Sequence, residues 1–178
     1  MVACNAASSA LDRDWAVPVV GIIETGIAQV CRSGHSRVAV WGGRRTILSG
    51  AYARPLRSRG IHVVQRVAQP LSALVERGKS SGPQVDAALA KVTRGLGEVS
   101  AIVLACTHYA ALEPAIRART PGVALLDPAE ALAHVVPGPT GGGPPVLECH
   151  TTGPPRSSRR AAQRAFGLDP GRFRSTRL

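Results

Sequence analysis

The sequence predicts an α/β fold, in which a parallel sheet has helices on both faces. Short apolar runs rich in β-branched residues recur along the chain, as expected of strands that are buried on both sides. Stretches with helical spacing of apolar residues separate these runs. Regular alternation of strand and helix is typical of right-handed crossovers between parallel strands. The 178 residues are enough for one domain or two small ones.

The elements are expected in a regular order along the chain. Three of the predicted helices stop near glycine, which readily adopts the left-handed conformation at a helix end. Pro55 is expected to kink or shorten the second helix, because proline lacks a backbone N–H. In chain order, strands are expected at 17–23, 37–41, 61–65, 101–105, 123–126 and 146–150, and helices at 25–33, 49–59, 83–97, 110–119 and 156–167.

The net charge of +11 is concentrated near the C-terminus. The segment 156–178 holds seven arginines against Asp169, and therefore carries +6 of that charge. Only two of the 22 basic residues are lysine, which indicates a general bias toward arginine. Aromatic residues make up 3% of the chain, so platforms for stacking bases are scarce. Nucleic acid is therefore not expected as a partner, and binding of polyanions by this basic segment is kept as an alternative function.

The chain is expected to be cytoplasmic and to have no membrane partner. No apolar run approaches the roughly 20 residues that span a bilayer. The first 14 residues lack the charged and apolar regions of a signal peptide. The four cysteines, at 4, 31, 106 and 149, match neither a zinc ribbon nor a Cys-x-x-Cys pair. A reduced chain without a metal site is the prediction.

Cys4 and Cys106 occupy matching places in the sequence. Each ends a short apolar run and is followed by a polar residue that can cap a helix, Asn5 in one case and Thr107 in the other. In open α/β sheets, ligands bind outside the carboxyl ends of the strands. Backbone N–H groups at the start of a helix favour anions and lower the pKa of a thiol. We therefore expect both thiols at the carboxyl edge of the sheet, close to a bound carboxylate.

Two thiols in equivalent settings suggest a reaction with two bases. One thiolate removes a proton from a carbon acid, and the other thiol returns a proton on the opposite face, which inverts the stereocentre. The sequence contains no metal or pyridoxal motif, so no cofactor is expected. For each thiol, the alternative is an inert buried side chain. For Cys31 and Cys149, which stand away from strand–helix junctions, this alternative is preferred.

His108, Glu24 and the segment 42–46 are further candidates for the site, and each has a second interpretation. His108, two residues after Cys106, is suited to orient or protonate a reacting group near neutral pH, or else bonds to backbone in a loop. Glu24, expected at the end of the first strand, is either a ligand-binding carboxylate or a solvent-facing charge. The segment 42–46 fits neither of the common phosphate-binding glycine motifs, and a simple strand–helix turn is preferred there.

Four ordered motifs resemble those of the glutamate racemases in the aspartate/glutamate racemase superfamily. The segment A-C-N-A-A-S is similar to the family's A-C-N-T-A-S, and A-C-T-H-Y to its G-C-T-H-Y. The stretch V-G-I-I-E-T-G resembles its V-I-E-P-G, and S-G-A-Y is shared unchanged. They lie in this sequence at 3–8, 105–109, 20–26 and 49–52.

The resemblance implies cofactor-independent interconversion of L- and D-glutamate, with D-glutamate supplied to peptidoglycan. Cys4 and Cys106 would be the two acid–base residues, and His108 would assist Cys106 as a third catalytic residue. The substrate is a small molecule, glutamate, and a homodimer is compatible with the resemblance. The residues implied in substrate binding are Asn5, Ala6, Thr107, His108 and Glu24.

The departures from the family pattern bear on domains and substrate. Family chains begin well before the first cysteine motif and carry D-S-G and P-Y-G there; neither triplet occurs here. We therefore expect a complete α/β racemase domain at 17–128, with remnants of a pseudo-symmetric second domain at 1–16 and at 129–178, the latter including the basic helix. Ala6 replaces a threonine hydroxyl, which keeps another amino acid or carbon acid open as the substrate.

Overall fold

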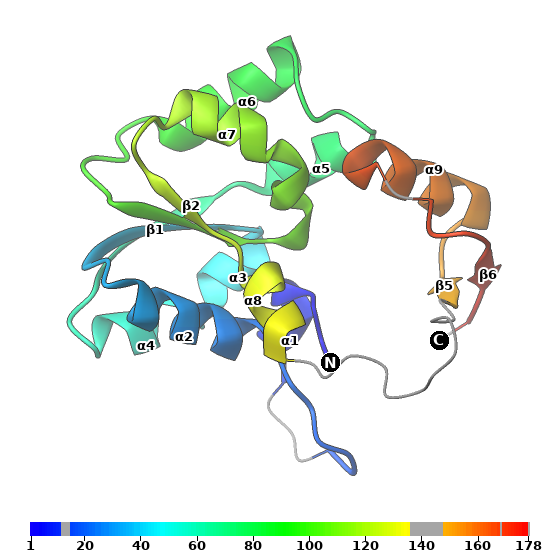
Figure 1. Cartoon of the computed structure of the whole chain (residues 1–178), viewed down its shortest axis with the longest axis horizontal. Helices are drawn as coiled ribbons and strands as arrows, with labels where there is room; N and C mark the ends of the chain where they lie inside the picture. The colour runs from blue at the N-terminus through cyan, green and yellow to red at the C-terminus, as the bar shows by residue number, and fades with distance from the viewer. Residues whose placement is uncertain (12–14, 136–147, 168, 178) are drawn as a thin grey trace.

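The centre of the structure, a computed structural model, is a four-stranded parallel sheet with the strand order β2-β1-β3-β4 (Figure 1). This parallel sheet and the helices that flank it confirm the predicted α/β class. The structure describes residues 1–11, 15–135, 148–167 and 169–177. The strands of this sheet are β1 (Arg37–Gly42), β2 (His62–Val67), β3 (Ala101–Ala105) and β4 (Ala124–Leu126).

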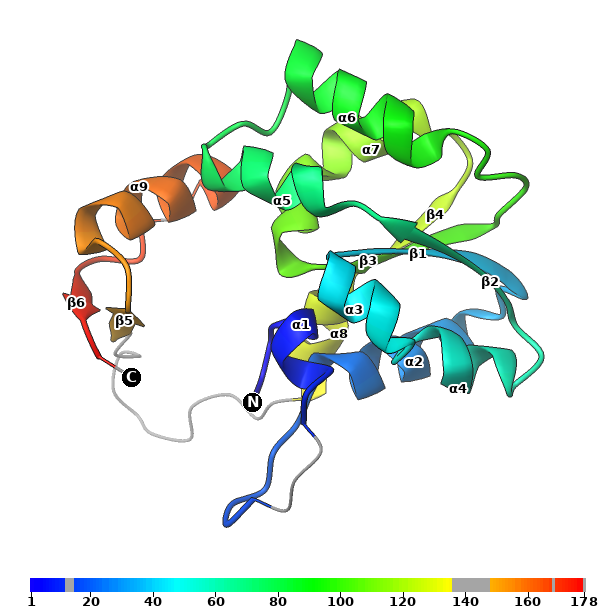
Figure 2. The ribbon, with the colours of Figure 1, turned by 180° about the vertical axis from the view of Figure 1, so that it is seen from behind.

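Helices cover both faces of this sheet, and together they form three layers (Figures 1 and 2). One face is covered by α2 (Ile22–Ser33), α3 (Arg44–Ser49), α4 (Ala53–Arg57) and α8 (Pro128–Val135). The other is covered by α5 (Gln69–Glu76), α6 (Pro83–Thr93), the 3-10 helix η1 (Thr107–Leu112) and α7 (Glu113–Arg119).

Alternate residues of the two central strands enter two separate cores. On β1, Val38 and Val40 pack with the helices of one face, while Ala39 and Trp41 pack with those of the other. All four side chains are fully buried. A strand presents successive side chains to opposite faces, so a strand without polar residues requires a cover on both sides. The uninterrupted apolar runs at 38–41 and 101–105 therefore lie in β1 and β3, where strands were predicted at 37–41 and 101–105.

The C-terminal part of the chain forms a small strand–helix–strand unit beside the main layers. It consists of β5 (Cys149–Thr151), α9 (Pro155–Phe166) and β6 (Phe173–Ser175), and its two strands pair in parallel. Figure 2 shows α9 lying against the end of α5. The predicted basic helix is confirmed, and it attaches to the main body through Ala165. The predicted strand 146–150 is displaced toward the C-terminus, and residues 146 and 147 lie outside the described part of the chain.

The predicted strand at 17–23 is wrong. Ile22 and Ile23 are the first residues of α2, with Gly21 as its N-cap. The apolar residues Ile22, Ile23, Ile27 and Val30 recur at helical spacing, and the core on that face contains them. The β-branched run therefore crosses from a loop into a helix. Its one contact of the sheet type is a parallel bridge between Val2 and Gly21.

The predicted helix 49–59 is too long: only Ala53–Arg57 of this range form a helix, α4, and Ser49 is the last residue of the preceding helix α3. Gly50 ends α3 in the left-handed conformation, with φ of 67°. Pro55 stands in the first turn of α4, where a missing N–H costs nothing. The predicted helix 110–119 likewise begins as η1 and continues as α7. The short helix α1 (Asn5–Ser8) corresponds to the helix start that was expected after Cys4. Four elements had no counterpart in the sequence analysis: α3, which shares only Ser49 with a predicted helix, α5, α8 and β6.

Among the described helices, none has the length and apolar character needed to cross a bilayer.

The division into domains at residues 16 and 128 stays a prediction. The helix that follows residue 127, α8, packs against α2 and contributes Leu132 to the core. The main layers thus include this helix.

We expect amide hydrogen exchange to be about 100-fold faster or more in 149–151 than in 101–105. β3 is buried between two neighbouring strands, whereas the pairing of β5 within the described residues is limited to the three residues of β6. Exchange measured by mass spectrometry or NMR tests this, with 37–42 as the control segment that should match 101–105. Equal protection of 149–151 and 101–105 would contradict the prediction.

Candidate active site

Cys4 and Cys106 both stand where extended backbone passes into a helix. Cys4 follows Val2, which bridges to Gly21, and is the N-cap of α1. Cys106 directly follows β3 and is the N-cap of η1. Cys106 thus lies at a strand end and a helix start, as expected. Cys4 lies at a helix start as expected, but the extended residues before it form a single bridge to Gly21 and belong to none of the described strands.

The two thiols line one hollow of about 160 Å³. Its walls come from α1, α3, α5 and the junction between β3 and η1. Cys4 contributes electrostatically to the raised pKa of Cys106, as expected of two thiols that line the same hollow. The lining residues are Cys4, Asn5, Ala6, Gly43, Thr46, Gln69, Ser72, Glu76, Ala105, Cys106, Thr107 and His108.

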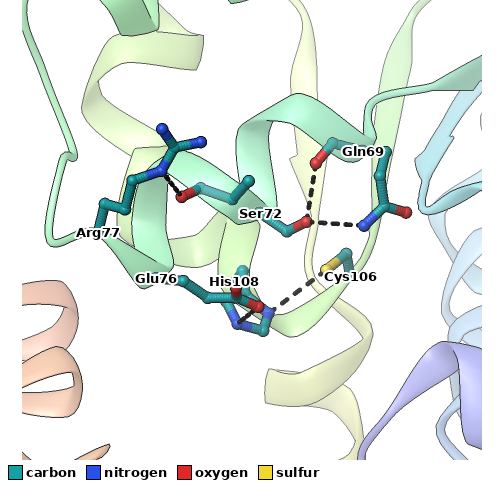
Figure 3. A network of polar contacts seen from close by, with 7 residues as sticks. Gln69, Ser72, Glu76, Arg77, Cys106 and His108 are labelled. Carbon is teal, nitrogen blue, oxygen red and sulfur yellow. Dashed lines mark hydrogen bonds and ion pairs between the residues drawn. The ribbon is translucent and has the colours of Figure 1, made fainter. Parts of the chain in front are cut away.

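Cys106, His108 and Glu76 form a chain of polar contacts. The Sγ atom of Cys106 lies 3.6 Å from Nδ1 of His108. On the other side of the ring, Nε2 of His108 lies 3.4 Å from Oε1 of Glu76. Figure 3 shows the imidazole between the thiol and the carboxylate, with Glu76 reaching over from the end of α5. A carboxylate on one ring nitrogen orients the imidazole.

The thiol of Cys106 is a weaker acid than the sequence suggested. Burial raises its pKa to about 11, and the negative charges of Cys4 and Glu76 act in the same direction. The backbone N–H of His108 opposes this shift but does not outweigh it. The expectation that the start of a helix would lower this pKa is therefore wrong, because desolvation of the thiolate is the larger effect. The resting state of Cys106 at neutral pH is the protonated thiol.

Amide and hydroxyl groups of α5 form another wall of the hollow. Oε1 of Gln69 accepts a hydrogen bond of 3.1 Å from the backbone N–H of Arg44. Nε2 of Gln69 donates to Oγ of Ser72, and that hydroxyl donates to the carbonyl of Gln69 (Figure 3). The Gln69 side chain also occupies the space beside Gly43, where a Cβ would come within 2.8 Å of Oε1. The turn at 42–46 thus contributes to the hollow.

The side chain of Asn5 is held by a hydrogen bond from Tyr52. The hydroxyl of Tyr52, which precedes α4, donates a hydrogen bond of 2.7 Å to Oδ1 of Asn5. Both side chains are buried. Nδ2 of Asn5 is buried as well and has no partner among the described residues. The arrangement leaves the amide NH₂ group of Asn5 without an acceptor among the described residues, and a ligand can provide one.

The structure brings most of the predicted site residues together. Cys4, Cys106, His108, Asn5, Ala6 and Thr107 all line the hollow. Glu24 does not: it lies in the first turn of α2 instead of at a strand end, and it borders separate surface depressions. Cys31 on α2 and Cys149 on β5 also lie elsewhere.

Five lining residues were not assigned to a site by sequence reasoning, and they come from α5 and the start of α3. α5 itself was not predicted, so its polar residues had no position relative to the thiols. For the turn at 42–46, the glycine pair Gly42-Gly43 after a strand was the one sequence signal of a binding site. These residues are Gly43, Thr46, Gln69, Ser72 and Glu76.

The described residues contain no group of three histidine, cysteine, aspartate or glutamate side chains that could hold a metal ion. All four cysteines are free thiols. The ionisable groups around the hollow are therefore those of Cys4, Cys106, His108 and Glu76. Together they can exchange protons with a small acid bound between them.

The fold is that of the glutamate racemase structures. The Thermus thermophilus glutamate racemase, solved in complex with β-chloro-D-alanine, matches 98% of this chain and 70% of its own, with a TM-score of 0.79 and 32% identity. A glutamate racemase isoform from Bacillus anthracis gives a TM-score of 0.83 at 24% identity, with 98% and 72% coverage. At that identity, the likeness concerns the fold alone.

The chain belongs to the Asp/Glu/hydantoin racemase family, whose sequence model matches residues 1–136. Curated glutamate racemases are also similar to it in sequence. The protein from Desulforudis audaxviator is 37% identical over 139 residues, which cover 72% of this chain and 51% of the relative. The protein from Thermus thermophilus is 40% identical over 143 residues, with 76% and 52% coverage. The chain thus spans about half the length of the curated relatives it matches.

We expect alkylation of Cys106 by iodoacetamide to have its midpoint near pH 11. A pKa about two units above the ordinary thiol value leaves roughly 100-fold less thiolate at pH 8, and the rate falls in proportion. The measurement is site-resolved alkylation by mass spectrometry between pH 7 and 11.5. The urea-unfolded chain, in which burial is lost, is the control and should titrate near the ordinary value. Equal rates at pH 8 in the folded and unfolded chain would contradict the assignment.

Proposed function

We propose that this chain is a glutamate racemase that interconverts L- and D-glutamate through Cys4 and Cys106. The observation that carries the proposal is that these two thiols, 102 positions apart in the sequence, line the same hollow. Curated relatives with 37% and 40% identity are glutamate racemases, which supports glutamate as the substrate. In a cell with peptidoglycan, the D-glutamate formed would supply its synthesis in the cytoplasm.

The proposed reaction is a transfer of one proton on each face of the α-carbon. A thiolate on one side removes the α-proton and becomes a thiol, and the electron pair remains on a planar carbanion. The thiol on the other side then donates its proton to the opposite face of that carbon and becomes a thiolate. The product is the other enantiomer, and the reverse reaction uses the same two groups in exchanged roles.

The resting protonation of Cys106 suits the donor role in this scheme. Its raised pKa keeps the proton on sulfur at neutral pH, so this thiol is ready to protonate the carbanion. In the opposite direction Cys106 must act as the base. A substrate ammonium group beside the sulfur would favour the thiolate electrostatically, and His108, 3.6 Å away, would accept the proton.

Glu76 and the residues next to the thiols complete the proposed machinery. Glu76 faces the His108 ring nitrogen that points away from the sulfur, and this contact would keep the other ring nitrogen directed at Cys106. The amide of Asn5 and the hydroxyl of Thr107 lie on the hollow, where they would bind the substrate's polar groups. Preorganised donors of this kind stabilise charge that develops in the transition state.

Ala6 supports a second candidate within the same class of reaction. It lines the hollow with a methyl group, so no hydroxyl is available at this position for a substrate carboxylate. A related amino acid such as aspartate, or another carbon acid, is therefore the alternative substrate. Comparison of exchange rates at the α-carbon of glutamate and aspartate distinguishes the two candidates.

We expect the chain to racemise glutamate in D₂O with deuterium appearing in the product, while the remaining substrate keeps its protium early in the reaction. The two thiols hold different protons, so the proton that leaves is not the one that returns. Replacing either reactive thiol, by Cys4→Ala or by Cys106→Ala, should lower racemisation about 1,000-fold, as for the loss of an essential acid or base. Circular dichroism and NMR of the α-proton give the two rates.

The matched control is Cys31→Ala, which removes an exposed thiol that does not line the hollow. This variant should keep the wild-type rate. Absence of α-proton exchange in the wild-type chain would overturn the proposal for glutamate. Retention of activity in Cys4→Ala would overturn the two-thiol mechanism.

A further inference from the structure

We propose that Tyr52 is a positioning residue of this site, which fixes the Asn5 side chain so that its amide NH₂ is offered to an acceptor oxygen of the substrate. The inference rests on the proposed function for the identity of that substrate, whose carboxylates supply such oxygens. Tyr52 itself does not line the hollow. Its effect on the reaction therefore passes through Asn5.

The contact between the two residues joins distant parts of the chain. Tyr52 lies between α3 and α4, and Asn5 is the first residue of α1, 47 positions earlier. The Oη–Oδ1 distance is 2.7 Å, and the exposed fractions are 1% for Tyr52 and 3% for Asn5. Water does not compete for a hydrogen bond at this depth, so the contact restrains the side chain of Asn5.

The chemistry of the pair sets the direction of the hydrogen bond. Burial raises the pKa of Tyr52 well above its ordinary value, and the carboxylates of Glu24 and Asp127 raise it further. The phenol therefore stays protonated and donates to Oδ1 of Asn5. Because an amide has its oxygen and its nitrogen on opposite sides, this bond fixes where Nδ2 lies.

Nδ2 of Asn5 has two N–H donors and no acceptor among the described residues. A buried donor without a partner is unfavourable and rare in folded proteins, and such groups mark places where a ligand completes the hydrogen bonding. Asn5 lines the hollow between the two thiols. An acceptor oxygen of a bound carboxylate is therefore the missing partner.

Gly26 provides the space that the Tyr52 ring needs. A Cβ at residue 26 would lie 2.7 Å from the Tyr52 hydroxyl oxygen and 2.9 Å from its Cε1 atom, with Cγ of Pro128 at 2.9 Å on another side. Gly26 lies inside α2, where glycine weakens the helix relative to alanine. The close approach of the Tyr52 hydroxyl accounts for a glycine at this place.

Tyr109 offers a matched control for removal of the hydroxyl. It is as buried as Tyr52, but its hydroxyl has no hydrogen-bond partner among the described residues. Tyr109→Phe therefore removes the same atom from an equally buried ring without breaking a described hydrogen bond. It controls for the general effect of losing a buried hydroxyl.

The kinetic test uses the full chain with Tyr52→Phe, Asn5→Ala and the double variant. We expect Tyr52→Phe to raise KM for glutamate about 10-fold with a smaller change in kcat, as for loss of one well-placed hydrogen bond. If Tyr52 acts through Asn5, the double variant is no worse than Asn5→Ala alone. A further loss of about 10-fold in the double variant would overturn the proposal.

A second readout does not depend on activity. The side-chain amide signals of Asn5 in a ¹⁵N–¹H spectrum are identified by their absence in Asn5→Ala. We expect these signals to shift in Tyr52→Phe and to stay in place in Tyr109→Phe. Unchanged signals in Tyr52→Phe would overturn the positioning role. A wild-type chain without glutamate exchange would overturn the proposed function instead, and the amide signals would still decide the role of Tyr52.

Discussion

The parallel pairing of β1 with β3 is the interaction on which the rest of the structure depends. Its register runs from Val38 opposite Ala101 to Gly42 opposite Ala105. Parallel pairing brings the carboxyl ends of both strands to one edge of the sheet. Beyond this edge, β1 continues through Gly43 into α3, and β3 continues through Cys106 into η1. This strand pairing therefore places Cys106 and the start of α3 beside each other at the hollow, and α1 and α5 supply its remaining walls.

Burial on both faces of these strands has a chemical consequence at their ends. The apolar layers that stabilise the sheet also remove water from Cys106, and this loss of solvation dominates its pKa. Burial also raises the pKa of Tyr52 and keeps water away from its hydrogen bond to Asn5. Groups at the edge of the hollow, such as Glu76 and His108, keep contact with solvent. The core thus keeps the proton on the Cys106 thiol.

Sequence reasoning was most successful where hydrophobic pattern and local chemistry agree. The runs at 38–41 and 101–105 form strands because no polar residue interrupts them, and the thiol after the second lies where a strand end would place it. The run at 17–23 failed because β-branched residues at the start of α2 also satisfy a helical spacing. α5 was missed, and with it Gln69, Ser72 and Glu76, which form one wall of the hollow.

The sequence by itself determined the α/β class, the covered sheet and the pair of thiols that follow matching apolar runs. These properties depend on residue order and on local preferences, which act over a few positions. Only the tertiary structure decided that Glu76 meets His108, that Tyr52 meets Asn5 and that Glu24 lies outside the hollow. It also reversed the expected direction of the Cys106 pKa shift. Contacts and desolvation of this kind depend on which distant segments pack together, and local sequence patterns carry no information about that packing.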